Sequence, residues 1–344
     1  MIKNLDEKNI IKNKSINLKF LSVSSKELSL NCKIYRGNFY LDSFNYFPIT
    51  TDYYSFLDLY SWKAKSEYND FFSNKFYLKF DKDKNNFKSF KNVVVLGSSP
   101  GDNYFRNLIT FIPRILFISD SEINLAIHRH TSNKLRKFIE NILKAKGIKI
   151  KKYIFLDNSF YSFENSQIPQ FFPKGVSINI LNKFFKKNKE NKDRIYLTRK
   201  NAKYRKIINE SDLIDELKLK NFKIIDVDTL DIEEQAHVFS SAKVIVSPTS
   251  SALTNIVFCQ KATKIFEIHP KYQFEYENNL KFRYASICKQ LNLKYSFIEA
   301  DPVKIKKFQS NLNKFIPKKV LDTSNYYQDL ILDKKKFEKL FLKN

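Results

Sequence analysis

Two arginines, Arg199 and Arg205, lie close together in the segment "TRKNAKYRKIINE". A guanidinium group donates two parallel hydrogen bonds and keeps its charge at neutral pH, which suits the oxygens of a diphosphate. The exposed, basic start of a helix has the same composition. The spacing therefore makes both arginines candidates for diphosphate binding. An exposed helix start that binds no ligand remains the alternative.

Two further segments carry groups that bind phosphates and sugars. In "SPTSSALTN" the hydroxyls of Thr249, Ser250 and Ser251 stand where a helix is predicted to begin, and backbone N–H groups at a helix N-terminus attract phosphate. An ordinary serine-rich helix cap has the same pattern. Glu267 closes the apolar segment "TKIFEI", and a carboxylate at the end of a strand commonly accepts hydrogen bonds from ribose hydroxyls.

The elements that must position these residues alternate regularly from Arg194 onward. Strands are predicted at 194–198, 222–227, 243–247, 263–268 and 294–298, with helical segments between them. Such alternation indicates parallel strands joined by right-handed crossovers, hence a doubly wound α/β domain. A ligand is then expected at the carboxyl ends of the strands, where the three loops gather.

The upstream half has fewer clear elements. Strands are predicted at 92–99, 123–127 and 151–156, and helices at 105–118 and 131–147, the first of which should kink or end at Pro113. Residues 157–192 are predicted to be rich in loops, and residues 1–90 are irregular and carry no specific signal.

The three segments resemble the core of the family 61 glycosyltransferases. The residues that match the family pattern are Arg199, Arg205, Asn209, Glu210, Glu234, Gln235, Pro248, Leu253, Thr254, Asn255 and Glu267. A second motif of the family is matched upstream by the segment "GDNYFRNLITFIPRILFI". The matching residues are Asn103, Tyr104, Leu108, Pro113 and Arg114. The resemblance covers roughly residues 90–270, and the shared spacing makes chance similarity improbable.

The resemblance implies a GT-B-like α/β fold, two Rossmann-like doubly wound domains facing a cleft. Residues 1–90 and 91–190 would form the N-terminal acceptor domain, 191–300 the nucleotide-sugar domain, and 301–344 a helical tail packed back on the protein. The implied enzyme is an inverting, metal-independent glycosyltransferase. It needs no cofactor beyond a UDP- or GDP-linked donor, and its acceptor is a glycan, a polysaccharide or a lipid-linked sugar. Gln235 and Asn255 join the expected donor-binding residues.

Several positions depart from the family pattern. Thr249 replaces a histidine, and Ser247, Ser250 and Ala252 replace glycines, which would allow close approach of the backbone to phosphate. Upstream, Arg106 replaces a histidine and Thr110 an aspartate, and neither is a good general base. Arg106, Thr110 and the nearby Asp102 are the catalytic candidates, with His128 and His130 as alternatives for the base.

Two Asp-x-Asp strings, Asp81/Asp83 and Asp226/Asp228, fit a loop and a strand-to-helix connection better than a metal site, so no metal ligand is predicted. A homologue that binds the donor but has lost catalysis is the first alternative function.

Charge suggests a second alternative, because the formal net charge is +25. A basic protein attracts nucleic acid or an anionic surface. The lysines are spread over almost every segment, however, and no zinc-finger, RNP-type or basic-zipper pattern accompanies them, so we expect no nucleic-acid partner.

Three widely spaced cysteines, a polar N-terminus and the lack of a membrane-spanning apolar run predict a cytoplasmic protein. The basic amphipathic end "DKKKFEKLFLKN" suggests peripheral contact with the inner face of the membrane.

Overall fold

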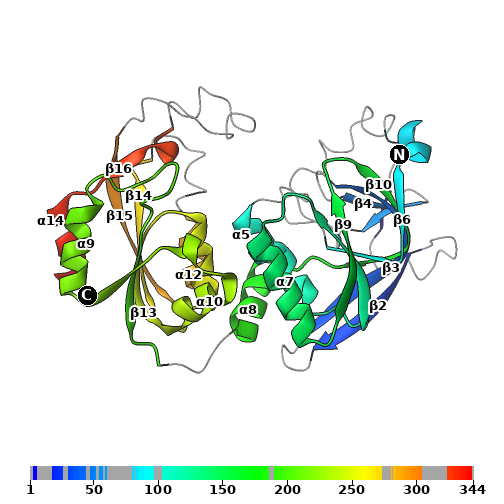
Figure 1. Cartoon of the computed structure of the whole chain (residues 1–344), viewed down its shortest axis with the longest axis horizontal. Coiled ribbons are helices and arrows are strands. Elements are labelled where there is room, and N and C mark those ends of the chain that lie inside the picture. The colour runs from blue at the N-terminus through cyan, green and yellow to red at the C-terminus, as the bar shows by residue number, and fades with distance from the viewer. Residues whose placement is uncertain are drawn as a thin grey trace. The chain divides into compact units, whose positions relative to one another are not determined.

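A computed structural model of the chain describes residues 3–5, 18–25, 30–43, 47–51, 54–56, 59, 80, 82–96, 103–185, 190–272, 280, 282–303 and 324–342. The chain divides into two compact units, Met1–Phe184 and Phe185–Asn344. Each has its own sheet and its own helices (Figure 1).

The sheet of the second unit confirms the predicted alternation. Its strands are β11 (Asp193–Leu197), β12 (Phe222–Ile225), β13 (Ala242–Pro248), β14 (Lys264–Pro270), β15 (Lys294–Val303) and β16 (Asp329–Ile331). They lie in the order β12-β11-β13-β14-β15-β16. The first five are parallel, and β16 pairs antiparallel with β15.

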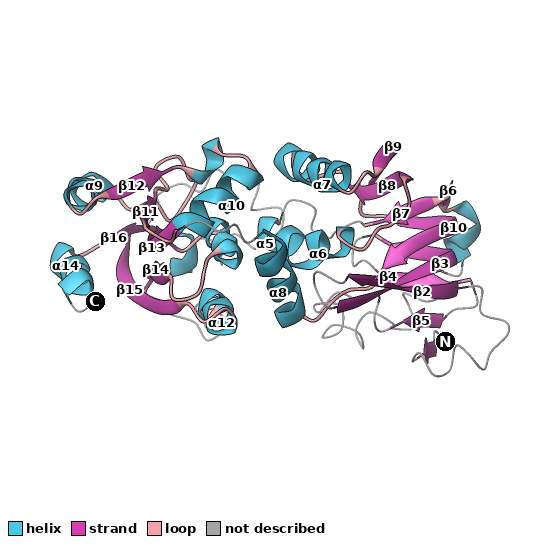
Figure 2. Ribbon diagram, turned by 90° about the horizontal axis from the view of Figure 1, so that it is seen from below, coloured by secondary structure: helices cyan, strands magenta, loops and turns pink. Residues whose placement is uncertain are grey.

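Helices cover both faces of this sheet. They are α9 (Glu210–Leu219), α10 (Ile232–Ser241), α12 (Arg283–Gln290) and α14 (Lys334–Leu342), with the short 3-10 segments η4 (Val227–Thr229), η5 (Ser251–Phe258) and η8 (Asn325–Tyr327). Figures 1 and 2 agree that α9 and α14 lie on one face and α10 and α12 on the other. The arrangement is consistent with the predicted Rossmann-like domain.

The strand order places a topological switch beside β11. From β11 the chain moves to β12 on one side, and it then crosses back to β13 on the other side. The loops that leave the carboxyl ends of β11 and β13 therefore go to opposite faces of the sheet. Such a point opens a crevice, and open α/β sheets bind their ligands there.

The C-terminal segment completes the core of the second unit with a strand as well as a helix. Leu330 of β16 and Phe337 of α14 are buried in the same apolar cluster as Leu213 and Leu217 of α9. The Asn209 side chain pairs with the backbone of Leu332, donating to its carbonyl at 2.9 Å and accepting from its N–H at 3.2 Å. This family-motif asparagine thus attaches the end of the chain to the start of α9.

The first unit contains a mixed sheet. Its strands are β2 (Leu18–Ser25), β3 (Leu30–Asp42), β4 (Phe47–Thr50), β6 (Lys88–Lys91), β7 (Val93–Val95), β8 (Glu122–His128), β9 (Lys149–Leu156) and β10 (Phe160–Pro169). The parallel order β10-β7-β8-β9 is extended by β3 and β2, which pair antiparallel. Strands β1 (Lys3–Leu5) and β5 (Tyr54–Phe56) form a separate parallel pair. The mixed α/β class is confirmed, whereas the GT-B arrangement stays a prediction.

Downstream of β7, the helices of the first unit gather on one face of its sheet (Figure 2). They are α5 (Tyr104–Arg106), the π-helical segment η3 (Asn107–Phe111), α6 (Ile112–Ile115), α7 (Asn133–Ala145) and α8 (Lys174–Phe185), and the short 3-10 turn η2 (Lys84–Asn86) lies upstream. The π-helical segment ends at Phe111, two residues before Pro113, which has no N–H for the ordinary helical hydrogen bonds, and the helix ends at Ile115. Ser132 caps α7 as its position predicts.

Two predictions about the first unit are wrong. Residues 157–192 are not mainly loop, because strand β10 and helix α8 occupy most of them. The alternation of buried and more exposed residues along β10 shifts at a bulge between Phe163 and Ser166, where Asn165 has a φ of 43°. The sequence pattern therefore did not indicate a strand. Residues 1–90 are not irregular throughout, since β2, β3, β4 and β6 lie there. Among the helices of the described residues, none has the length and apolar composition to cross a bilayer.

Candidate functional site

A polar pocket of about 140 Å³ lies at the switch point of the second unit. It is lined by the residues that follow β11, β12 and β13, so the crevice expected from the strand order is present. Its polar lining comprises Thr198, Arg199, Asn201, Asp226, Asp228, Ser250 and Ser251. The pocket thus combines a cation, two carboxylates and several hydroxyls.

Arg199 supplies the cation of this pocket. Its Nη2 donates to the carbonyl of Tyr204 at 2.9 Å, and its Nε donates to the carbonyl of Arg205 at 3.3 Å. Nη1 makes no hydrogen bond to the described residues. Burial and the neighbouring Arg205 lower the pKa of Arg199 to about 10, so the group stays cationic at neutral pH. One edge of the guanidinium therefore fixes its own loop.

Glu210 holds the start of the Arg199 loop in place. Its carboxylate is buried at the beginning of α9 and accepts hydrogen bonds from the Tyr196 hydroxyl and the Thr198 hydroxyl, both at 2.8 Å. It also accepts from the backbone N–H of Arg199 at 3.3 Å. This family-motif glutamate therefore positions Arg199 and does not line the pocket itself.

Arg205 belongs to the same loop as Arg199 but does not line the pocket. Its side chain is 4% exposed, and its guanidinium carbon is 4.8 Å from the centre of the Tyr204 ring and 4.1 Å from that of Tyr326. Nε and Nη1 have no hydrogen-bond partner, and its φ of 58° is unusual for a residue with a side chain. A buried cation with two unsatisfied donors is costly unless an oxygen can reach them.

The hydroxyl-rich turn after β13 is extended and unstrained. Ser250 and Ser251 line the pocket, whereas Thr249 is buried and donates its backbone N–H to Ile268 at 2.7 Å. The Tyr284 hydroxyl donates to the carbonyl of Ser250 at 2.5 Å. No residue from 247 to 252 has a positive φ, so the turn does not need the glycines of the family pattern. The segment that follows is the 3-10 helix η5.

Gln235 and Asn255, both predicted to bind the donor, bind each other. The Asn255 amide donates to Gln235 Oε1 at 2.7 Å, and Gln235 Nε2 donates to the carbonyls of Val227 and Leu230. Both side chains are buried outside the pocket lining. Their hydrogen bonds join α10 to η5 and to the connection after β12, which gives them a structural role.

Glu267 is also buried away from the pocket lining. Its side chain is fully buried on β14, and its Oε2 accepts from the Tyr295 hydroxyl at 2.7 Å. The other oxygen, Oε1, has no hydrogen-bond partner. Burial raises the pKa of Glu267 to about 7, although the nearby hydroxyls of Thr249 and Tyr295 favour the ionised form. The predicted contact with a ribose is not formed by the pocket as it stands.

Asp226 has the structural role that its position suggested, and both Asp226 and Asp228 line the pocket. Asp226 Oδ1 accepts the backbone N–H of Asp228 at 3.0 Å, and its Oδ2 accepts from the Asn201 amide at 3.1 Å. Sequence reasoning missed the role in the pocket, although Asp226 directly follows the strand paired with β11 and Asp228 lies two residues further on. Asp81 of the other Asp-x-Asp string lies outside the described residues. Within the part of the chain that is described, no cluster of three or more His, Cys, Asp or Glu side chains could hold a metal ion.

The catalytic candidates of the first unit differ in their exposure. Asp102 lies outside the described residues. Arg106 is half-buried in α5, and Thr110 is buried in η3. The family-motif residue Arg114 is fully buried, and it donates to the carbonyl of Pro169 from Nη2 at 2.6 Å and to that of Leu96 from Nη1 at 2.8 Å. Arg114 thus ties the carboxyl ends of β10 and β7 together.

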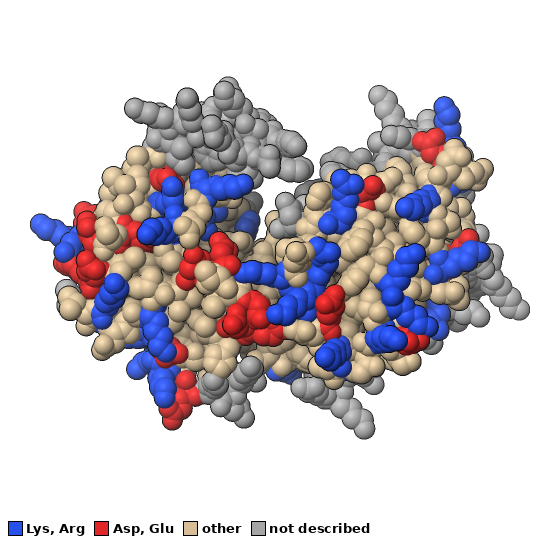
Figure 3. Space-filling model, in the orientation of Figure 1, with Lys and Arg blue, Asp and Glu red and all other residues tan. Residues whose placement is uncertain are grey.

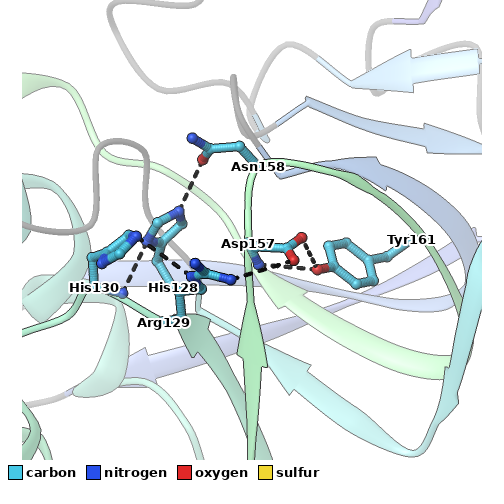
Figure 4. A network of polar contacts seen from close by, with 6 residues as sticks. All are labelled: His128, Arg129, His130, Asp157, Asn158 and Tyr161. Atoms are coloured by element: carbon cyan, nitrogen blue, oxygen red, sulfur yellow. Dashed lines mark hydrogen bonds and ion pairs between the residues drawn. The ribbon is translucent and has the colours of Figure 1, made fainter. Parts of the chain in front are cut away.

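His128 and His130 stand at the carboxyl end of β8 in a polar network (Figure 4). His128 is buried, its Nδ1 accepts the backbone N–H of His130 at 3.2 Å, and its Nε2 therefore donates to Asn158 Oδ1, 2.9 Å away. Both nitrogens of His128 are engaged, so His128 does not suit a general base. His130 is exposed and its Nε2 accepts from Arg129 Nε at 3.4 Å.

Comparison with protein-family models places the chain in a known family. The sequence model of the family described as Glycosyltransferase 61 matches residues 46–266. This range includes most of the first unit, the pocket, and the strands β11, β12 and β13 that frame it. No curated protein matches the chain.

Proposed function

Because the chain belongs to glycosyltransferase family 61, we propose that it moves a sugar from a nucleotide-diphosphate donor to a glycan, polysaccharide or lipid-linked acceptor. The observation that carries the proposal is the place of Arg199 in a polar pocket at the switch point of the second unit. A pocket of about 140 Å³ holds part of such a donor and not all of it. We assign this part to the diphosphate and the group next to it.

In this proposal Arg199 binds the diphosphate through Nη1. Its charge is carried on a loop that Glu210 and two backbone carbonyls hold in place, so little reorganisation accompanies binding. Ser250 and Ser251 line the same pocket, and their hydroxyls donate to the remaining phosphate oxygens. Arg205 Nε and Nη1 would donate to a ligand oxygen that reaches the guanidinium.

The proposed reaction is a direct, inverting displacement. An acceptor hydroxyl attacks the anomeric carbon, the bond between that carbon and the diphosphate oxygen breaks, and a base takes the hydroxyl proton. Arg199 stabilises the charge that develops on the leaving diphosphate, which is the task a metal ion would otherwise perform. Arg106 and Thr110 do not accept protons at neutral pH, and both ring nitrogens of His128 are engaged, so Asp102 is the base in this scheme and His130 is the alternative.

Binding of nucleoside diphosphates tests the donor site. Calorimetry with UDP and GDP should show binding to the unaltered protein, and Arg199→Ala should weaken it ten- to hundredfold, equal to about 1.5–3 kcal/mol for a charge-assisted hydrogen bond. Lys200→Ala is the matched control, because it removes a neighbouring exposed positive charge. Equal losses in both variants, or no binding of either nucleotide, would refute the assignment.

Turnover distinguishes transfer from binding alone. A donor-binding homologue without transferase activity is the second candidate, favoured by the burial of Thr110 and by arginine at position 106. Release of nucleoside diphosphate from a panel of UDP- and GDP-sugars, with and without EDTA, decides between them. Release that survives EDTA supports the metal-independent transferase, and binding without release supports the homologue.

The distribution of charge bears on the remaining alternative, a binder of nucleic acid. On the face shown in Figure 3, Lys and Arg are dispersed among Asp, Glu and uncharged residues. Groove-tracking nucleic-acid binders collect their basic residues into a stripe or patch. On the face in view, this distribution favours the sugar donor as the anionic ligand.

A further inference from the structure

We propose that Asp226 and Asp228 recognise the vicinal hydroxyls of the donor's ribose, so that the pocket selects a ribonucleoside diphosphate over a deoxy analogue or an inorganic anion. The inference rests on the proposed donor site and adds the group that gives it specificity. Neither aspartate was predicted to bind a ligand, and Glu267 was expected in this role instead.

The register of the sheet places the carboxylates next to the cation. Leu197 of β11 pairs with Ile225 of β12, so the residues that follow, Thr198 and Asp226, leave adjacent strand ends. The Thr198 N–H donates to the carbonyl of Ile225 at 3.0 Å, which fixes this alignment. Parallel strands lie about 4.8 Å apart. Arg199 and the two aspartates therefore present opposite charges from neighbouring strands to one small cavity.

The balance of charge in the pocket determines what can enter it. The charged lining is one guanidinium, Arg199, and two carboxylates. A bare phosphate or pyrophosphate would meet more negative than positive charge there, although the chain as a whole is strongly basic. A favourable ligand must bring an anion for Arg199 and hydrogen-bond donors for the carboxylates. A sugar phosphate ester has both, and hydroxyl groups that donate to a carboxylate form charge-assisted bonds.

Two hydrogen bonds orient the Asp226 carboxylate, and it can still accept others. Each carboxylate oxygen has two lone pairs, and each oxygen of Asp226 uses one in the hydrogen bonds from Asp228 N–H and Asn201 Nδ2. The second lone pair of each oxygen remains for a ligand hydroxyl. Asp228 follows on the exposed turn η4, and its charge also supports the protonated form of Arg199.

Asp226 lies where other doubly wound sheets carry an acidic residue that binds ribose. An acidic side chain shortly after the second strand of a nucleotide-binding βαβ unit accepts from the ribose hydroxyls. Here β11, α9 and β12 form that unit, and Asp226 is the residue directly after β12. Glu267 does not compete for the role, because it is fully buried outside the pocket lining.

Calorimetry on four proteins tests the inference. The proteins are the unaltered chain, Asp228→Asn, Asp226→Asn and the control Asp215→Asn, which removes the same charge from an exposed position of α9. The ligands are UDP, GDP, their 2′-deoxy and 3′-deoxy analogues, and pyrophosphate. We expect the unaltered chain and the control to bind the ribonucleotide at least tenfold more tightly than its deoxy analogues. Asp228→Asn should reduce that ratio to less than threefold and should not weaken pyrophosphate.

The outcomes separate this inference from the proposed function. If no diphosphate binds the unaltered chain, both are overturned. If the ribonucleotide binds but Asp228→Asn keeps the full preference for it over the deoxy analogues, the inference alone is overturned. A loss of preference in the control as well would also overturn it, because a long-range charge effect would then explain the result. Asp226→Asn should behave like Asp228→Asn while its thermal unfolding stays cooperative. If its unfolding is no longer cooperative, Asp228→Asn, which leaves the hydrogen bonds of Asp226 in place, decides the question.

Discussion

The guanidinium carbon of Arg205 lies 4.1 Å from the centre of the Tyr326 ring, although 120 residues separate the two positions in the chain. The contact joins the loop after β11 to the C-terminal segment. Tyr204 contacts the same guanidinium at 4.8 Å. Two aromatic rings thus compensate part of the cost of burying a cation whose Nε and Nη1 lack hydrogen-bond partners.

The first prediction concerns this contact. Tyr326→Leu should lower the free energy of unfolding by about 2 kcal/mol, the worth of a desolvated cation–π interaction. Tyr326→Phe keeps the ring and should cost clearly less. Urea unfolding measures both changes. Equal losses in the two variants would show that the hydroxyl, and not the ring, matters to Arg205.

Glu210 gives the second prediction. Glu210→Ala leaves the fully buried Tyr196 hydroxyl without its acceptor, and we expect a loss of about 2–3 kcal/mol in the free energy of unfolding. The double variant Glu210→Ala, Tyr196→Phe removes both partners and should recover part of that loss. A double variant with fully additive losses, measured by urea unfolding, would contradict the coupling.

The third prediction is a dependence of stability on pH. The pKa of Glu267 is about 7 in the folded chain and 4.5 in a model peptide, so between these values the folded state holds a proton that the unfolded state releases. The contribution of Glu267 to the free energy of unfolding is therefore fully present below the unfolded pKa of 4.5. It falls by about 1.4 kcal/mol per pH unit as the pH rises from there, until the pH passes the folded pKa of about 7.

The variant Glu267→Gln should remove this dependence. Between about pH 5 and about pH 8, the stability of the unaltered chain relative to the variant should fall by about 2–3 kcal/mol. Glu299→Gln, which removes a carboxyl group from the neighbouring strand β15, is the control. A constant difference between Glu267→Gln and the unaltered chain would mean that Glu267 titrates normally.

The turn after β13 leads to the fourth prediction. Restoring the family glycines with Ser250→Gly and Ala252→Gly should destabilise the chain by about 0.5–1 kcal/mol per site, because neither residue has a positive φ. Asn221→Gly, at a φ of 60°, is the control and should be neutral or stabilising. Thermal unfolding compares the three variants. A stabilised Ser250→Gly would indicate strain in the turn.

Local pattern was sufficient for much of the second unit. The strands from β11 to β15 are short apolar runs bounded by polar turns, and their parallel pairing follows from the helices between them. The position of the crevice follows from that topology, so Arg199, Ser250 and Ser251 could be placed at it from the sequence. In the first unit the bulge at Asn165 displaced the alternation of β10, which made this strand appear as loop.

Whether a polar side chain faces a ligand or another side chain was decided only by the tertiary structure. Gln235 and Asn255 look like ligand-binding amides in the sequence, but residues 20 positions apart meet and satisfy each other in the interior. Asp226 fits a strand-to-helix connection in the sequence, and its side chain caps η4 there, yet the register of β12 against β11 also brings it to the pocket beside Arg199. The sequence by itself determined the order of strands and helices and hence the edge of the sheet where chemistry is expected. Only the tertiary structure determined which hydrogen bonds are used internally, because a buried donor or acceptor must be paired by whatever the fold brings within reach.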